Sequence, residues 1–255
     1  MNEPNLTPSF AGKTVLVTGS QSGIGCATAD YFQQHGARVL RVDINGKHQP
    51  PWHCAIDLAQ PEATNALMHT LSTANIEVDL LAHVAGILSI GPLLDMPLEE
   101  WLRLFAVNTH AAFYLCQQLG RQMAARRRGA MVLVGSNCAR VPRLQIGAYA
   151  ASKAASQQML KCLGLELAEF GVRCNVVAPG STDTAMQTQL WPQTDGKASA
   201  IAGNATQYRL GIPLKKVATA RDIAEVIGFL LSEQARHITL ETITVDGGAT
   251  LGCGH

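Results

Sequence analysis

Short apolar runs and longer amphipathic stretches alternate along the whole 255-residue chain. Apolar runs bounded by glycine or polar residues indicate buried strands, whereas apolar residues spaced three or four positions apart indicate helices. The expected strands are residues 13–18, 37–43, 53–57, 78–84, 130–135, 172–177 and 239–245. The expected helices are residues 23–35, 61–75, 97–128, 147–170 and 219–233. This alternation predicts one α/β domain over residues 1–255, a doubly wound parallel sheet of about seven strands with helices on both faces.

One long stretch, residues 180–213, follows neither pattern. A connection of that length inside a compact domain is usually functional, often as a lid over a binding site. We therefore expect a substrate lid at about residues 181–213.

Composition narrows the class of protein. Hydrophobic residues make up 47% of the chain and charged residues 15%, so the chain can form a large core and does not have the composition of a disordered protein. The 20 basic residues nearly balance the 19 acidic ones, which argues against a nucleic-acid partner. The most apolar region, residues 80–94, contains His83, Gly86, Gly91 and Pro92 and is too short for the ~20 residues of a membrane span.

The termini and the cysteines point to the cytoplasm. Residues 1–13 lack the basic cluster and apolar run of a targeting segment. The seven cysteines are odd in number and scattered, without a C-x-x-C pair, so a disulfide framework is not expected. His48, His53, Cys54 and Asp57 lie near one another, but their spacing fits no known pattern of metal ligands, and we expect no metal site.

A glycine-rich loop, TGSQSGIG at 18–25, lies between the first expected strand and the first expected helix. Gly19, Gly23 and Gly25 allow a tight turn and let the backbone approach a pyrophosphate at the helix N-terminus. The spacing G-x-x-x-G-x-G differs from the common G-x-G-x-x-G, and no Lys-Ser/Thr follows as in a P-loop. The triplet alone is also compatible with a plain tight turn, but its position favours a dinucleotide site.

Asp43 ends the second expected strand, 18 residues after Gly25 (43 − 25). A carboxylate there can accept hydrogen bonds from both ribose hydroxyls of an adenosine, which favours NAD over NADP. The alternative is a surface aspartate in a turn. Neither Ser20 nor Gln21 offers positive charge to a 2′-phosphate, although Arg41 lies two residues upstream.

Four polar residues form a candidate catalytic group. Tyr149 and Lys153 are four residues apart on an expected helix, which places both on one face. Ser136 follows the fifth strand, at the sheet edge where ligands bind in such folds. Asn108 lies in the preceding helical stretch.

At these positions the chain resembles the short-chain dehydrogenase/reductase family over nearly its whole length. The matching pieces are TGSQSGIG (18–25), Asp43, Asp57, Val107-Asn108, Ser136, YAASK (149–153) and PGSTDT (179–184). The resemblance implies a Rossmann-like fold and a catalytic tetrad of Asn108, Ser136, Tyr149 and Lys153. The family's N-N-A-G reads His83-Val84-Ala85-Gly86 here, so the brace that the first Asn gives the sheet must be made differently.

Longer runs are similar to one group within that family, the 2,3-dihydro-2,3-dihydroxybenzoate dehydrogenases of catecholate siderophore biosynthesis (the enterobactin type). They are VPRLQIGAYAASK (141–153), RCNVVAPGSTDTAMQ (173–187), LGIP (210–213) and HITLETITVDGGATLG (237–252). The likeness implies NAD-dependent oxidation of an aromatic-precursor carboxylic acid, in a cytoplasmic homotetramer. Transient contact with a downstream acid-activating ligase would fit that role.

The resemblance also assigns binding residues. NAD is expected at Gly19, Ser22, Gly23, Ile24, Gly25, Asp43, Asp57, Leu58, Ala85, Gly86, Tyr149, Lys153, Pro179, Thr182 and Thr184. The substrate is expected at Ser136, Arg143, Tyr149 and Met186. An arginine fork can hold a carboxylate with two parallel hydrogen bonds, and Arg143 is the first candidate, with Arg140 or the lid at 180–213 as the alternatives.

The expected chemistry is hydride transfer to the nicotinamide, with Tyr149 as phenolate base. Ionising a phenol of pKa ~10 near neutrality requires about 4 kcal/mol, which one ammonium at ~4 Å can supply at an effective dielectric of ~20. Lys153, helped by the positive nicotinamide ring, is expected to supply it and to hold the nicotinamide ribose, while Ser136 binds the reacting oxygen. Asn108 is expected to interrupt its helix and hold a water that links Lys153 to solvent.

Two other functions remain open at this point. A relative that reduces 3-oxoacyl thioesters would prefer NADPH and gives no reason for arginines in the substrate loop. A non-catalytic dinucleotide sensor or scaffold typically lacks the Tyr or the Lys, and both are present here.

Overall fold

Seven parallel strands form one sheet in the order β3-β2-β1-β4-β5-β6-β7 in the computed structural model, which describes residues 9–190 and 196–252. The strands are β1 (Thr14–Thr18), β2 (Arg38–Asp43), β3 (His53–Ala55), β4 (Leu80–His83), β5 (Gly129–Val134), β6 (Val172–Pro179) and β7 (Thr242–Val245). The chain runs outward in one direction from β1 to β3 and in the other from β4 to β7. The expected doubly wound parallel sheet is confirmed, and its order reverses between β1 and β4.

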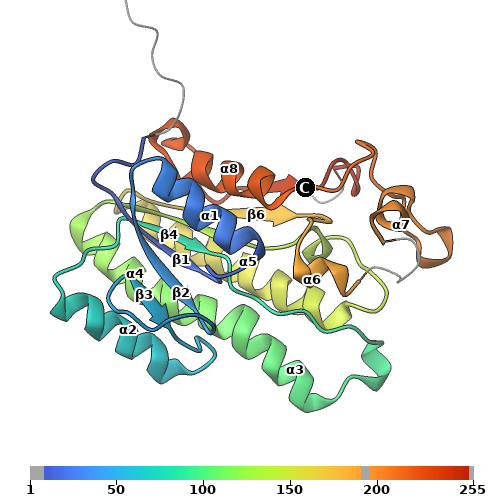
Figure 1. Ribbon diagram of the computed structural model, residues 1–255, viewed down its shortest axis with the longest axis horizontal. Helices are drawn as coiled ribbons and strands as arrows, with labels where there is room; N and C mark the ends of the chain where they lie inside the picture. Colours follow the sequence, from blue (N-terminus) through green and yellow to red (C-terminus); the bar gives the residue numbers. More distant parts are fainter. Residues whose placement is uncertain (1–8, 191–195, 253–255) are drawn as a thin grey trace, which may run out of the picture.

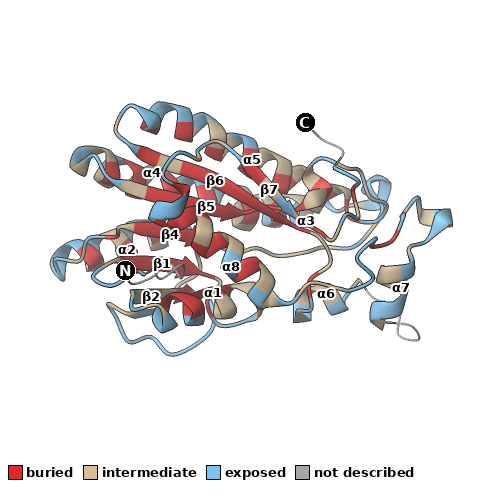
Figure 2. Cartoon of the chain, turned by 90° about the horizontal axis from the view of Figure 1, so that it is seen from above, coloured by how far each residue is buried: buried red, intermediate tan, exposed pale blue. Residues whose placement is uncertain are grey.

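Helices cover both faces of this sheet (Figures 1 and 2). One face carries α1 (Gly23–Gln34) and α8 (Ala220–Leu231), which pack on each other, and the other carries α2 (Pro61–Thr73), α4 (Ala111–Arg126) and α5 (Gly147–Ala168). Alternate strand residues face the two layers: Val15 and Val17 pack with α1 and α8, whereas Leu16 packs with the opposite layer. The central strands are therefore buried on both sides, as their continuous apolar runs predict.

The long expected helix at 97–128 is divided. It forms α3 (Leu98–Phe105), a π-helical turn (Ala106–His110) and α4. The apolar periodicity continues through the turn, so the sequence pattern did not reveal a break; Asn108 at its centre makes the contacts described below that hold it.

The expectation of an irregular stretch at 180–213 is wrong in part. The segment contains α6 (Ala185–Thr188), α7 (Gly196–Ala202) and a 3₁₀ turn (Ala205–Gln207). These elements are too short to produce a clear helical period in the sequence. Residues 191–195 of the predicted lid lie outside the described residues, and α7 lies at the periphery of the molecule (Figure 1).

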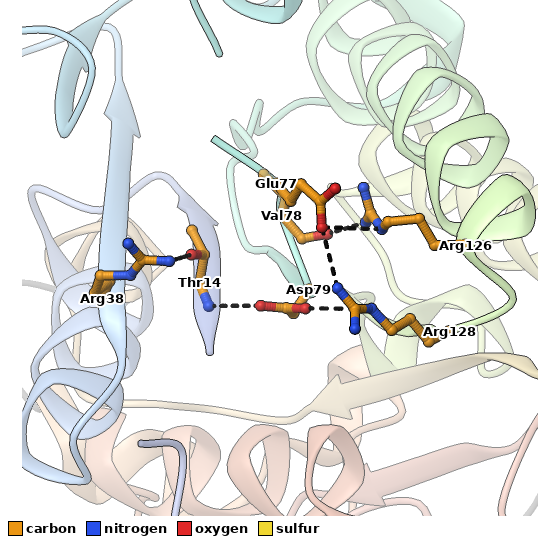
Figure 3. Close-up of polar contacts among 7 residues, drawn as sticks. All are labelled: Thr14, Arg38, Glu77, Val78, Asp79, Arg126 and Arg128. Carbon is orange, nitrogen blue, oxygen red and sulfur yellow. Dashed lines mark hydrogen bonds and ion pairs between the residues drawn. The ribbon is translucent and has the colours of Figure 1, made fainter. Parts of the chain in front are cut away.

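The basic residues at the end of α4 make contacts at the edge of the sheet where the parallel strands begin (Figure 3). Arg126 donates to the carbonyl of Val78 (2.7 Å), and Arg128 forms an ion pair with Glu77 (3.0 Å). Asp79 in turn accepts the backbone N–H of Thr14 (2.9 Å). These arginines join the end of α4 to the beginning of β4. No helix in the described part of the chain is both long enough and apolar enough to cross a membrane.

Candidate active site

A cavity of about 1150 Å³ opens along the carboxyl edge of the sheet, where the strand order reverses. Every residue predicted for the cofactor lines this cavity, as do Ser136, Arg143 and Met186. Asn108 lies behind the wall and is 1% exposed. Residues predicted from separate motifs of the sequence therefore meet in one place.

The glycine loop has no room for side chains. A Cβ on Gly25 would lie 1.9 Å from the carbonyl oxygen of Gly19, and one on Gly19 would lie 3.0 Å from the backbone of Ala85. Gly23 has φ +49° and faces the Thr184 side chain, 3.1 Å from where its own Cβ would lie. Ser22, the N-cap of α1, makes no side-chain capping bond. The loop thus presents bare backbone and the N-terminus of α1 to the cavity, as a pyrophosphate requires.

Asp43 is held at the end of β2 by backbone groups. One carboxylate oxygen accepts the N–H of Gln21 (2.9 Å) and the other accepts the N–H of Asn45 (2.9 Å). A carboxylate has further acceptor capacity, so it can still receive two hydroxyls. Arg41, the basic side chain nearest in sequence, pairs instead with Asp30 of α1 (2.5 Å). The adenosine end of the cavity therefore carries negative charge.

The catalytic group is assembled from β5 and α5. Lys153 is 4% exposed, and its Nζ donates to the carbonyl of Val134 (2.9 Å) and lies 5.9 Å from the centre of the Tyr149 ring. Ser136 Oγ accepts the backbone N–H and the thiol of Cys138 (3.3 and 3.0 Å). Gln157 donates from the second turn after Tyr149 to the backbone carbonyl of Ser136 (3.0 Å). Ser136, Tyr149 and Lys153 are therefore fixed relative to one another by buried hydrogen bonds.

Burial disfavours the charged forms of both Tyr149 and Lys153. Burial raises the pKa of Tyr149, an effect that Cys138 reinforces and the hydrogen bond with Ser136 opposes. Burial also lowers the pKa of Lys153 to about 8. Burial outweighs the other effects on both groups in the protein without a bound cofactor, so the expectation that Lys153 acts together with the positive nicotinamide ring stays a prediction. Formation of the phenolate would need further positive charge in the cavity.

Asn108 connects α5 to the loop that follows β4. Its amide donates to the carbonyl of Ile87 and to Ser152 Oγ (both 2.9 Å) and accepts the N–H of Ile87 (2.8 Å). A Cβ on Gly86 would lie 3.0 Å from Lys153 Nζ and 3.1 Å from Asn108 Oδ1, so the two polar groups meet beside this glycine. Interruption of the helix at Asn108 is confirmed, while the water it would hold remains a prediction.

His83 stands where the family has an asparagine that braces the sheet, and here Thr18 makes the connection between β1 and β4. Thr18 Oγ1 accepts the N–H groups of Val84 and Ala85 (both 3.0 Å) and lies 3.2 Å from His83 Nδ1. A hydroxyl has one donor and two acceptor sites, so Thr18 donates to His83 Nδ1. The proton is then on His83 Nε2, which is buried without a partner. Burial and the nearby Lys153 lower the pKa of His83 to about 3, and the ring is neutral.

More residues contribute to the expected substrate end of the cavity than the sequence indicated. Arg143 and Met186 line it, whereas Arg140 is exposed and outside it. Three contributing residues were missed: Cys138, Gln157 and Arg209. Only Arg209 carried a sequence signal, since it directly precedes the LGIP run at 210–213. The residues His48, His53, Cys54 and Asp57, which are close in sequence, have different surroundings. His48 accepts the N–H of Ala55 (3.3 Å), whereas Asp57 lines the cavity.

Comparison with known proteins extends these observations. A family model described as enoyl-(acyl carrier protein) reductase matches residues 19–250. The chain is 44% identical to the vibriobactin-specific 2,3-dihydro-2,3-dihydroxybenzoate dehydrogenase of Vibrio cholerae, over 95% of this chain and 98% of that one. It is 45% identical to the 2,3-dihydro-2,3-dihydroxybenzoate dehydrogenase of Escherichia coli, over 95% and 99%. A 3-oxoacyl-(acyl-carrier-protein) reductase of Vibrio cholerae is 32% identical, over 94% and 98%.

Solved structures agree in fold. The aldohexose dehydrogenase of Thermoplasma acidophilum superposes with a TM-score of 0.86 at 27% identity, covering 96% of this chain and 97% of that one. A 4-hydroxyisoleucine dehydrogenase complexed with NADH superposes with a TM-score of 0.84 at 26% identity, covering 94% and 100%.

Proposed function

The chain belongs to the short-chain dehydrogenase/reductase family, and from that premise we propose that it oxidises 2,3-dihydro-2,3-dihydroxybenzoate to 2,3-dihydroxybenzoate with NAD⁺. The observation that carries the proposal is the likeness to enzymes of that name at 44% and 45% identity over nearly the full chain, together with Ser136, Tyr149 and Lys153 lining one cavity and Asn108 buried behind its wall. The reductase of 3-oxoacyl thioesters is a more distant relative at 32%.

The cavity fits a nicotinamide dinucleotide. The glycine loop at 18–25 would hold the pyrophosphate, Asp43 the adenosine ribose and Lys153 the nicotinamide ribose. The preference for NAD is supported by the fixed Asp43 carboxylate and by the engagement of Arg41 with Asp30. When bound, the nicotinamide supplies the hydride acceptor and a positive charge.

The protein groups then handle the proton. Ser136 holds the hydroxyl of the substrate through its Oγ, whose position Cys138 and Gln157 fix. Tyr149 accepts the hydroxyl proton, and the buried Lys153 ammonium stabilises the resulting phenolate. Loss of the proton and a hydride from one C–H leaves a ring ketone, which tautomerises to the catechol. Formation of the aromatic ring favours the oxidative direction.

The experiment compares substrates on the purified protein. NAD⁺ reduction is followed with 2,3-dihydro-2,3-dihydroxybenzoate and with simple secondary alcohols, and NADPH oxidation is followed with a 3-oxoacyl thioester. We expect kcat/KM for the dihydrodiol acid to exceed that for every other substrate, with 2,3-dihydroxybenzoate recovered as product. Faster turnover of the thioester, or no aromatic product, would overturn the proposal.

We further propose a cytoplasmic homotetramer that passes its product to an acid-activating ligase by transient contact. Free cysteines are consistent with a reducing compartment: Cys26, Cys54, Cys116, Cys138, Cys162 and Cys174 are all unpaired. The groove between α4 and α5 is consistent with an interface, because exposed apolar side chains such as Phe113 line it.

A further inference from the structure

Two arginines from distant segments line the cavity, near enough to each other for the charge of Arg143 to act on Arg209. Arg143 lies in the loop that leads to α5, and Arg209 follows the 3₁₀ turn Ala205–Gln207. Both line the same cavity as Ser136 and Tyr149. Neither guanidinium makes a hydrogen bond or an ion pair with any residue that the structure describes, and Arg209 Nε is buried without a partner.

This arrangement is costly unless an anion joins it. Burial lowers the pKa of Arg209, and the nearby Arg143 lowers it further. Two like charges that face each other in a partly dehydrated space repel, and unpaired buried donors lose hydrogen bonds that water would give. Glu99 of α3 also lines the cavity but forms no ion pair with either arginine within 4.0 Å. The two forks are therefore available to a ligand rather than to the protein.

The backbone holds Arg209 in place. Asn204 and Arg209 exchange both backbone hydrogen bonds (2.8 and 2.9 Å) across an antiparallel bridge. The turn is closed by Gly203 and Gly211, both with positive φ, and a Cβ on Gly203 would lie 2.4 Å from the nitrogen of Gly211. Arg209 is thus presented by a tight loop with little freedom, which reduces the entropy cost of binding.

We propose that Arg143 and Arg209 together form the site for the ring carboxylate of the substrate. The proposal rests on the proposed function and deepens it, because it names the group that orients the ring. A carboxylate has two oxygens and about four acceptor positions, enough for two forks. With the carboxylate fixed, the choice of the hydroxyl that faces Tyr149 follows from the geometry of the ring.

The test separates recognition of charge from shape. Arg209→Gln, Arg143→Gln and the double variant are compared with Arg140→Gln, a matched change of an exposed arginine outside the cavity. Calorimetry measures the Kd of the NAD-loaded protein for 2,3-dihydroxybenzoate, salicylate and the neutral carboxamide of each. Thermal unfolding shows that each variant is folded.

We expect Arg209→Gln to weaken binding of both acids by about 10-fold or more, as loss of a charge-assisted bond does, and to change binding of the carboxamides by less than about 3-fold. Arg209→Lys should recover part of the loss, because an ammonium lacks the planar fork. Loss of both arginines should leave acid and amide bound almost equally. An Arg209→Gln protein that binds acids like Arg140→Gln, or that loses acid and amide alike, would overturn the two-arginine site.

Turnover of the dihydrodiol acid by the unmodified protein is measured beside these titrations. Turnover with acid binding that is independent of Arg209 removes the site and leaves the proposed function intact. Binding of ring carboxylates that depends on Arg209, without turnover of the dihydrodiol acid, removes the proposed function and leaves the site. Failure of the unmodified protein both to bind the acids and to turn the dihydrodiol over removes both.

Discussion

Tyr149 and Lys153 share a buried pocket in which each group's charged form is disfavoured by lost hydration. A base that is protonated until positive charge arrives is active mainly when cofactor is present. This makes the dependence of the reaction on Tyr149 testable without disturbing the fold, because replacement by Phe removes one oxygen and preserves the ring.

Tyr149→Phe should lower kcat by at least about 10²-fold, the usual contribution of a positioned general base. The Kd for NAD, from fluorescence titration, should stay within a few-fold of the unmodified value, since Lys153 remains. Tyr208→Phe is the control: Tyr208 is 84% exposed, and its loss of a hydroxyl should leave kcat unchanged. A Tyr149→Phe protein with more than about a tenth of the original kcat would not use Tyr149 as its base.

Asp43 is expected to determine the choice between NAD⁺ and NADP⁺. A 2′-phosphate would meet this carboxylate as like charge, at about 4 kcal/mol per charge pair at ~4 Å and an effective dielectric of ~20. Even a quarter of that corresponds to a several-fold difference in affinity. We expect kcat/KM to favour NAD⁺ over NADP⁺ clearly, and Asp43→Ser to reduce that preference by about 10-fold. Equal kcat/KM for both cofactors in the unmodified protein would contradict this assignment.

At the scale of elements, the junction of β1 and α1 depends on backbone contact. Gly25→Ala would place a methyl group 1.9 Å from the carbonyl oxygen of Gly19, so α1 must shift away from the loop. We expect the Kd for NAD to rise by at least about 10-fold and Tm to fall by several degrees, the shift that about 1 kcal/mol produces. In the control, Gly91→Ala, the new methyl group meets nothing within 4 Å, and both quantities should be unchanged. Unaltered NAD affinity in Gly25→Ala would show that this loop does not hold the pyrophosphate.

The junction of β1 and β4 depends on a neutral histidine. The pKa of His83 is lowered to about 3, below the ordinary ~6.5 of the unfolded chain. Below pH ~6.5 the unfolded chain therefore binds the proton first, and the free energy of unfolding falls as pH falls, by up to about 1.4 kcal/mol per pH unit. Above pH ~6.5 this contribution to stability is fully present.

His83→Asn should remove this pH dependence. Between pH 7 and pH 5 the unmodified protein should lose about 2 kcal/mol more stability than His83→Asn, measured by urea unfolding at one protein concentration. His69→Asn, at an exposed position of α2, should follow the unmodified protein at both pH values. Parallel pH profiles for the unmodified protein and His83→Asn would mean that His83 is not held neutral by burial.

The sequence predicted elements well where local pattern and burial agree. The central strands carry continuous apolar runs and their bounds differ from the structure by one or two residues. The last strand begins at Thr242 rather than at 239, because Leu240 has φ +63° and the N–H of Glu241 bonds to the Asn175 side chain. Contacts of that kind join distant parts of the chain and leave no local pattern. The interruption at Asn108 likewise follows from the family resemblance and not from the apolar periodicity, which continues through it.

At the scale of the whole molecule, local sequence pattern likewise predicts one part of the site, while contacts between distant segments decide the rest. The meeting of the glycine loop with Ser136, Tyr149 and Lys153 at one cavity was predictable, because these residue types stand at the spacings of the family motifs, while their catalytic roles stay predictions. Arg209 was not, because its role depends on a turn that brings it to Arg143 from 66 residues away (209 − 143). The raised pKa of Tyr149 was also unpredictable, since burial is a property of the assembled layers.

Apolar side chains of α4 and α5 are exposed on the surface of the folded chain, and the proposed homotetramer would cover them. A groove of about 540 Å³ lies between α4 and α5, and Phe113 on its wall is 39% exposed. Leu165 of α5 is 68% exposed and stands in the sequence between Leu163 and Glu166, which line the groove. In a symmetric interface of two copies, a residue near the two-fold axis faces its own copy, so one substitution places two like charges together. We expect Phe113→Glu and Leu165→Glu each to reduce the assembly from four 27.2 kDa chains to two or one, measured by light scattering after size exclusion. Leu94→Glu is the control, because Leu94 is 98% exposed on the 3₁₀ turn Leu93–Asp95 and does not line the groove, and it should not change the mass. A mass unchanged in both α4 and α5 variants would place the interface elsewhere, and a single chain in the unmodified protein would exclude the tetramer itself.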